Sequence, residues 1–101
     1  MIKEAEYKTF DGEIMHCDRP VLLIFGAEWC GHCRSMEPII ENIEKERHDI
    51  AVYHVDVDKQ PALAERFSVQ SIPALFVIKN GNITERMTGA QPKHRILALL
   101  D

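Results

Sequence analysis

The stretch from Pro20 to Cys33, PVLLIFGAEWCGHC, decides the fold of this chain. It opens on a short apolar run, Pro20–Phe25, of the kind that forms a strand buried on both faces of a sheet. A brief connector follows, and Cys30 and Cys33 then stand where apolar residues begin to recur at helical spacing. The stretch therefore predicts a strand that leads directly into a helix, with a cysteine pair at the junction.

The spacing of Cys30 and Cys33 indicates redox chemistry. Two cysteines separated by two residues can close a small, reversible disulfide. At the beginning of a helix, the first sulfur faces unpaired backbone N–H groups and the positive end of the helix dipole. Both favour the thiolate over the thiol, and the thiolate is the nucleophile in disulfide exchange.

Outward from this stretch, strand and helix signals alternate along the chain. We expect a weak first strand within residues 1–8, a short helix from Thr9 to about Cys17, a strand at 20–25, a helix at about 31–47, a strand at 51–57, a helix from Gln60 through Phe67, strands at 74–79 and 82–88, and a final helix at 92–100. Asn80-Gly81 is a hairpin signal between the last two strands. This order predicts an α/β fold, with a mixed sheet of four or five strands flanked by helices on both faces.

Composition limits the classes of function. The chain has 101 residues, of which 46% are hydrophobic, so we expect a single domain over residues 1–101 with one core. The net charge of −4 argues against binding nucleic acid through its phosphates. No apolar stretch approaches the roughly 20 residues that cross a bilayer, and residues 1–7 lack the apolar centre of a secretory signal. We therefore expect a cytoplasmic protein with no nucleic-acid or membrane partner.

The cysteine count is three, an odd number that does not suit a framework of structural disulfides. With Cys30 and Cys33 paired, Cys17 is left over. One interpretation of Cys17 is a small hydrophobic residue on the first helix. The other is an exposed regulatory or dimer-forming thiol.

The chain resembles the thioredoxin family. The matching segments follow the family order over nearly the whole chain from about Thr9: FGAEWCGHC at 25–33, VDVD at 55–58, SIPAL at 71–75, FVIKNG at 76–81 and MTGA at 87–90. A lone CxxC is a weak motif, whereas one that follows an apolar strand and precedes an Ile-Pro and a hairpin is specific. The resemblance implies the thioredoxin fold and a protein-disulfide oxidoreductase of cell redox homeostasis. It also implies protein disulfides as substrates, no cofactor, and a reductase such as thioredoxin reductase as partner.

The resemblance also implies roles for individual residues. Cys30 would be the attacking thiolate and the more exposed of the pair, and Cys33 would be the resolving thiol, buried one turn further in. The peptide bond between Ile72 and Pro73 would be cis, although cis is normally the minority state even before proline. Substrates would dock on a flat, mostly apolar rim formed by Trp29, Ile72, Pro73, Gly89 and Ala90.

His32 departs from the family pattern. Thioredoxins usually have Gly-Pro between the cysteines, whereas this chain has Gly31-His32, the dipeptide of protein disulfide isomerase. A histidine beside Cys30 can donate a hydrogen bond or positive charge to the thiolate, which stabilises the reduced form and makes the disulfide a better oxidant. We therefore expect His32 to lower the pKa of the Cys30 thiol. The alternative is that His32 is simply an exposed helix residue that does not influence Cys30. Reduction of substrates is the expected direction, with oxidase or isomerase activity as the alternative.

Ile24 and His54 depart from the pattern together. Thioredoxins commonly have a buried Asp at the position of Ile24, as a proton acceptor beneath the resolving cysteine, and often a Lys at that of His54. Losing both avoids leaving one buried charge uncompensated. Either Ile24 simply adds packing and His54 is a neutral, partly buried strand residue, or His54 or Glu28 takes over proton transfer to Cys33. Gly26 replaces an aromatic residue, so space is left that is either refilled or kept as a groove.

A metal-binding module is the rival from another class. Two thiolates, with Cys17 or a second chain supplying further ligands, would hold zinc or an iron–sulfur cluster. Only one CxxC is present, so the closing ligands are missing from the motif itself.

Overall fold

A five-stranded mixed sheet forms the centre of the computed structural model, which describes residues 2–101. The strands, in the spatial order β1-β3-β2-β4-β5, are β1 (Lys3–Glu4), β2 (Val21–Gly26), β3 (Ala51–Asp56), β4 (Ala74–Lys79) and β5 (Asn82–Thr88). β3 pairs in parallel with both β1 and β2, whereas β4 is antiparallel to β2 and β5. The predicted α/β class and mixed sheet are confirmed.

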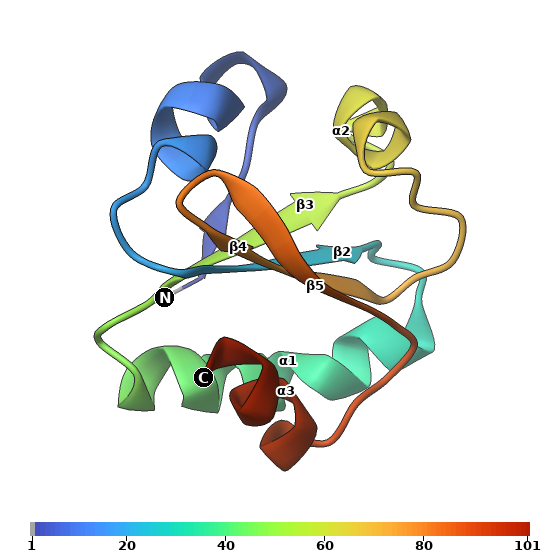
Figure 1. Cartoon of the computed structure of the whole chain (residues 1–101). Coiled ribbons are helices and arrows are strands. Elements are labelled where there is room, and N and C mark those ends of the chain that lie inside the picture. The colour runs from blue at the N-terminus through green and yellow to red at the C-terminus, as the bar shows by residue number, and fades with distance from the viewer. Residues whose placement is uncertain (1) are drawn as a thin grey trace.

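Helices cover both faces of this sheet (Figure 1). The helices α1 (Gly31–Glu46) and α3 (Lys93–Leu100) lie on one face, and α2 (Pro61–Arg66) lies on the other with the N-terminal turns η1 (Tyr7–Thr9) and η2 (Asp11–Met15). From β2 onward, every element begins and ends within one residue of its predicted bounds.

The N-terminal elements differ from the prediction. In place of one helix from Thr9 to about Cys17, η1 is a 3₁₀ turn and η2 a π-helix. The segment is thus helical, as predicted, but its turns are tighter and then wider than those of an α-helix, and Phe10 and Ile14 are fully buried in it. The first strand is shorter than the predicted range, since only Lys3–Glu4 pair with β3; Met1 lies outside the described residues.

The central strand β2 explains the continuous apolar run of the sequence. Its side chains alternate between the two faces: Val21, Leu23 and Phe25 belong to the core on the α2 side, and Leu22 and Ile24 to the core on the α1 side. All of its residues are buried. A strand that is covered on both faces has no solvent side, and therefore needs apolar residues at successive positions.

All four phenylalanines of the chain meet in the core on the α2 side. The ring centroid of Phe67 lies 5.5 Å from that of Phe10, 5.4 Å from that of Phe25 and 5.0 Å from that of Phe76. Such aromatic pairs contribute about 0.5–1.5 kcal/mol each beyond the area they bury. Phe67 directly follows α2, so it ties that helix to β2, β4 and the N-terminal turns.

Three chain segments converge at one end of the sheet. Phe25 pairs with Ala74, which places the carboxyl end of β2 beside the beginning of β4. Ala74 also pairs with Thr88, so the end of β5 lies there as well. The connector from β2 to α1, the residues before β4 and the residues after β5 therefore lie together (Figure 1).

We expect Phe67→Ala to lower the free energy of unfolding by about 3–5 kcal/mol, because it leaves a cavity among three other rings. Urea denaturation followed by circular dichroism measures this loss. Ile83→Thr is the matched control on the surface of β5, where Ile83 is 48% exposed, and it should cost less than about 0.5 kcal/mol. Similar losses in the two variants would contradict the central place given to Phe67.

Candidate active site

Cys30 and Cys33 form a disulfide at the N-terminus of α1, with their Cα atoms 5.2 Å apart. Cys30 is the N-cap of the helix, and its backbone is extended, with φ −89° and ψ 110°. The backbone N–H of Cys33 donates a hydrogen bond to Cys30 Sγ at 3.1 Å. Because the first turn of a helix leaves its N–H groups without helical partners, this N–H would stabilise a thiolate on Cys30 after reduction.

The exposure of the two cysteines is the reverse of what the resemblance implies. Cys30 is 7% exposed, whereas Cys33 is half-buried. The reason lies at Gly26, where a β-carbon would stand 3.3 Å from Cys33 Sγ. Without a side chain at that position, Cys33 stays open on this side. The expectation that Cys30 is the more exposed thiol is therefore wrong for the disulfide form.

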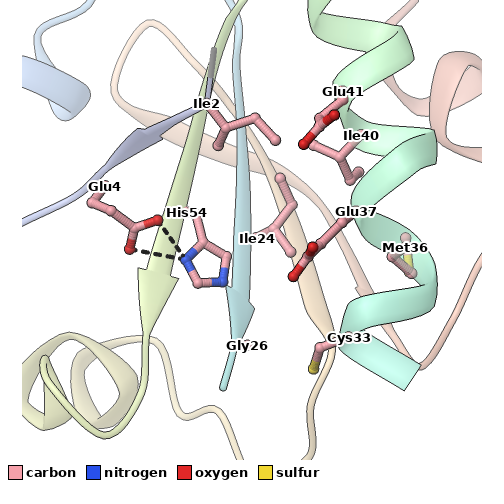
Figure 2. A pocket seen from close by; sticks show the side chains of 10 residues that line it. All are labelled: Ile2, Glu4, Ile24, Gly26, Cys33, Met36, Glu37, Ile40, Glu41 and His54. Carbon is pink, nitrogen blue, oxygen red and sulfur yellow. Dashed lines mark hydrogen bonds and ion pairs between the residues drawn. The ribbon is translucent and has the colours of Figure 1, made fainter. Parts of the chain in front are cut away.

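Gly26 borders a cavity of about 210 Å³ beside Cys33 (Figure 2). Its lining combines apolar side chains with ionisable ones: Ile24, Met36 and Ile40 with Glu4, Glu37, Glu41 and His54. A groove therefore remains beside Gly26, while His54 and Cys33 pack closely around the position of the missing β-carbon itself.

His54 reaches this cavity from β3, and its side chain is 30% exposed. Its Nδ1 lies 2.9 Å from Oε2 and 3.0 Å from Oε1 of Glu4. The sheet register pairs Glu4 with His54 and His54 with Ile24, so these three positions form a row across β1, β3 and β2. The partial burial of His54 agrees with its interpretation as a strand residue. Glu4 was missed, because a two-residue edge strand carries no signal for its register.

The predicted docking rim lies at the end of the sheet where the three segments converge. The bond between Ile72 and Pro73 is cis, as the resemblance implies. Gly89, with φ +88°, donates its backbone N–H to the carbonyl oxygen of Pro73 at 2.8 Å, which joins the loops before β4 and after β5. Ala90 follows and is exposed. A positive φ of this kind suits glycine, because it has no Cβ.

Trp29 is the most exposed large apolar residue among residues 2–101, at 67%. Its Nε1–H donates a hydrogen bond to Oδ2 of Asp58 at 2.8 Å. The indole is thus held beside the cysteine pair while its face stays open to solvent. Asp58 is a site residue that the sequence did not single out, although it closes the VDVD segment.

His32 lies exposed on the first turn of α1. Its backbone carbonyl accepts a hydrogen bond from Ser35 Oγ at 2.8 Å, while its ring makes no hydrogen bond or ion pair within residues 2–101. The ring is therefore not held by another side chain.

Cys17 is a free thiol, half-buried against the core on the α2 side. This placement agrees with its interpretation as a small hydrophobic residue. Within residues 2–101, no group of three or more His, Cys, Asp or Glu side chains is placed to hold a metal ion. The same residues include no helix with the length and apolar character to span a membrane.

Comparison with known proteins agrees with this geometry. The family model described as Thioredoxin matches residues 1–101. The chain is 35% identical to the thioredoxin of Streptomyces clavuligerus over 97 residues. The matched region covers 96% of this chain and 91% of that protein. It is 34% identical over 98 residues to the thioredoxin of Rickettsia prowazekii (strain Madrid E), a match that covers 96% of this chain and 93% of that protein. It is also 37% identical over 98 residues to the chloroplastic M-type thioredoxin of Zea mays, a match that covers 96% of this chain and 59% of that protein.

The family model spans residues 1–101, and within that range Cys30 and Cys33 close a disulfide at the N-terminus of α1. The chain therefore belongs to the thioredoxin family and is a thiol–disulfide oxidoreductase whose redox pair is Cys30 and Cys33.

Proposed function

We propose that this protein reduces disulfide bonds of protein substrates in two successive exchanges. The Cys30 thiolate attacks one substrate sulfur, a bond between Cys30 and that sulfur forms, and the other substrate sulfur leaves as a thiolate that solvent protonates. Cys33 then attacks Cys30 Sγ, which closes the Cys30–Cys33 disulfide and releases the second substrate sulfur. The substrate gains two electrons and the dithiol loses them. A disulfide reductase such as thioredoxin reductase returns the protein to the dithiol.

The hydrogen bond at the helix N-cap is the observation that supports Cys30 as the nucleophile. Cys30 Sγ accepts from the N–H of Cys33 at 3.1 Å, whereas Cys33 lies inside the helix and has no such cap. The low exposure of Cys30 points the other way. The N-cap decides the assignment, because the thiolate and not the thiol is the nucleophile.

Trapping of the mixed disulfide tests these two roles. In a Cys17→Ala background, Cys33→Ser should accumulate an adduct between Cys30 and a disulfide-bonded peptide, since no resolving thiol remains. Cys30→Ser should give at least tenfold less adduct at neutral pH. Mass spectrometry of the intact protein measures both yields. Equal adduct formation through Cys33 would reverse the assignment.

We propose that Trp29, Ile72, Pro73, Gly89 and Ala90 form the docking rim for protein substrates. The support is that these residues come from segments that converge beside the cysteine pair, and that Trp29 is held there by Asp58. Aromatic anchors of this kind often dominate the binding energy of an interface.

We expect Trp29→Ala to raise the KM for a disulfide-bonded peptide about tenfold, which corresponds to about 1.4 kcal/mol of binding. The rate with a small aromatic disulfide should change less than twofold, because such a reagent is too small to need the rim. Steady-state kinetics with both substrates separates the two effects. Equal losses with both would mean that Trp29 acts on the thiol and not on docking.

We propose that His32 raises the reduction potential of the Cys30–Cys33 pair. Equilibration with glutathione should give a value between about −270 mV, as in thioredoxin, and about −180 mV, as in protein disulfide isomerase. His32→Pro should lower the potential by at least about 30 mV, equivalent to about 1.4 kcal/mol. A wild-type potential at or below about −270 mV would show that His32 does not set it. A potential at the upper limit would favour the second candidate function, disulfide oxidation or isomerisation.

We also propose that the chain acts as one domain, in the cytoplasm, as part of cell redox homeostasis and its electron transport. The support is chemical: Cys17 is a free thiol, and the one disulfide among residues 2–101 is the exchangeable pair. Such cysteine usage suits a reducing compartment.

A further inference from the structure

We propose that His54, oriented by Glu4, accepts the proton of Cys33 in the second exchange, a role that rests on the function proposed above. A resolving cysteine must lose its proton before it attacks, because the thiolate is the nucleophile. The family pattern supplies an aspartate for this at the position of Ile24. Ile24 is 5% exposed and has no group that accepts a proton, so a base for Cys33 must come from another position or from solvent.

The base and the thiol converge at Gly26. A β-carbon at this position would lie 3.1 Å from His54 Nε2 and 3.3 Å from Cys33 Sγ, both closer than an ordinary van der Waals contact, so the two atoms approach each other over the bare Cα of Gly26. Both residues also line the cavity of about 210 Å³. At this end of the cavity, polar atoms of His54 and Cys33 face the space, which has room for a water molecule that bridges the nitrogen and the sulfur. In Figure 2, the His54 ring stands between Glu4 on one side and Gly26 and Cys33 on the other.

Glu4 gives the two ring nitrogens of His54 different roles. Its carboxylate accepts a hydrogen bond from Nδ1, at 2.9 Å to Oε2, which leaves Nε2 of the neutral ring as the proton acceptor on the Cys33 side. Once Nε2 takes the proton, the same contact becomes an ion pair that stabilises the charged ring. Glu4 is thus a positioning residue, and His54 is the base.

The backbone holds this pair in place. Glu4 and His54 are direct partners in the register of β1 and β3, and the N–H of Ala5 donates to the carbonyl oxygen of His54 at 2.8 Å. The departures at 24, 26 and 54 then form one coordinated change. Ile24 removes the family's acid, His54 supplies a base, and Gly26 leaves the path between that base and Cys33 clear.

In the second exchange, every proton and electron that moves is accounted for by His54, the two cysteines, the substrate sulfur and solvent. His54 Nε2 takes the proton from the Cys33 thiol through the bridging water, and the Cys33 thiolate attacks Cys30 Sγ. The Cys30–Cys33 bond forms, while the bond from Cys30 to the substrate sulfur breaks and its electron pair leaves on that sulfur. The proton then passes from His54 to solvent. The substrate disulfide is the oxidant, so no further reactant is needed.

Other ionisable groups surround His54 from several elements. On the side of α1, Glu37 and Glu41 share the cavity with Cys33. On the opposite side, His54 lines a second cavity together with five other charged residues: Glu4, Glu6, Glu28, Asp56 and Lys59. Among these residue types, only histidine and cysteine ordinarily titrate between pH 6 and 9. A pH dependence of the second exchange in that range therefore reports on His54 and Cys33.

The two exchanges can be timed separately with 5,5′-dithiobis(2-nitrobenzoate), which releases one coloured thiolate in each. With reduced Cys17→Ala protein in excess, the first release follows attack by Cys30. The second follows attack by Cys33, and its rate should not depend on protein concentration. We expect His54→Gln to slow the second release at pH 7 at least tenfold, within the range of general-base catalysis, and to shift its pH dependence upward. The first release should stay within twofold of the parent.

Glu4→Gln should slow the second release by a smaller factor, about threefold, and keep a histidine-like pH profile, because the base remains but is less well oriented. His94→Gln is the matched control, since His94 is exposed on α3, and both releases should stay within twofold. A second release in His54→Gln with the parent's rate and pH profile would overturn the proposal. Loss of the first release in the Cys17→Ala parent would instead contradict the proposed function.

Discussion

The hydrogen bond from the Cys33 N–H to Cys30 Sγ is the interaction on which the chemistry depends. It exists because a helix begins where a buried strand has just ended, so that an N–H of the first turn meets a sulfur. β2 is held on both faces by the two cores, and α1 is anchored through Met36, Ile40 and Ile43. The hydrophobic packing therefore fixes the junction, and the junction gives the sulfur its electrostatic surroundings.

The fold could be predicted largely from local signals. The apolar run at 20–25 and the helical spacing after Cys33 were sufficient for β2 and α1, and Asn80-Gly81 marked the hairpin of β4 and β5. Prediction failed where tertiary packing decides. The first helical segment was predicted, but not the 3₁₀ turn and the π-helix by which it buries Phe10 and Ile14.

The site was predicted only in part, for a related reason. Cys30, Cys33, Pro73 and Gly89 belong to motifs, and a motif can be read along the chain. The contact between Glu4 and His54 joins residues 50 positions apart through a two-residue edge strand, and its register is visible only in the folded sheet. The relative exposure of the two cysteines depends on the cavity that Gly26 borders. A cavity is a property of packing and cannot be read from residue order.

The most direct test of the central claim is the ultraviolet titration of the thiolate in the reduced Cys17→Ala protein, with Cys33→Ala to isolate Cys30. If the helix N-terminus stabilises the charge on Cys30, the thiolate should be half-formed below about pH 7.5, compared with about pH 8.5 for free cysteine. A midpoint at or above that of free cysteine would contradict the account.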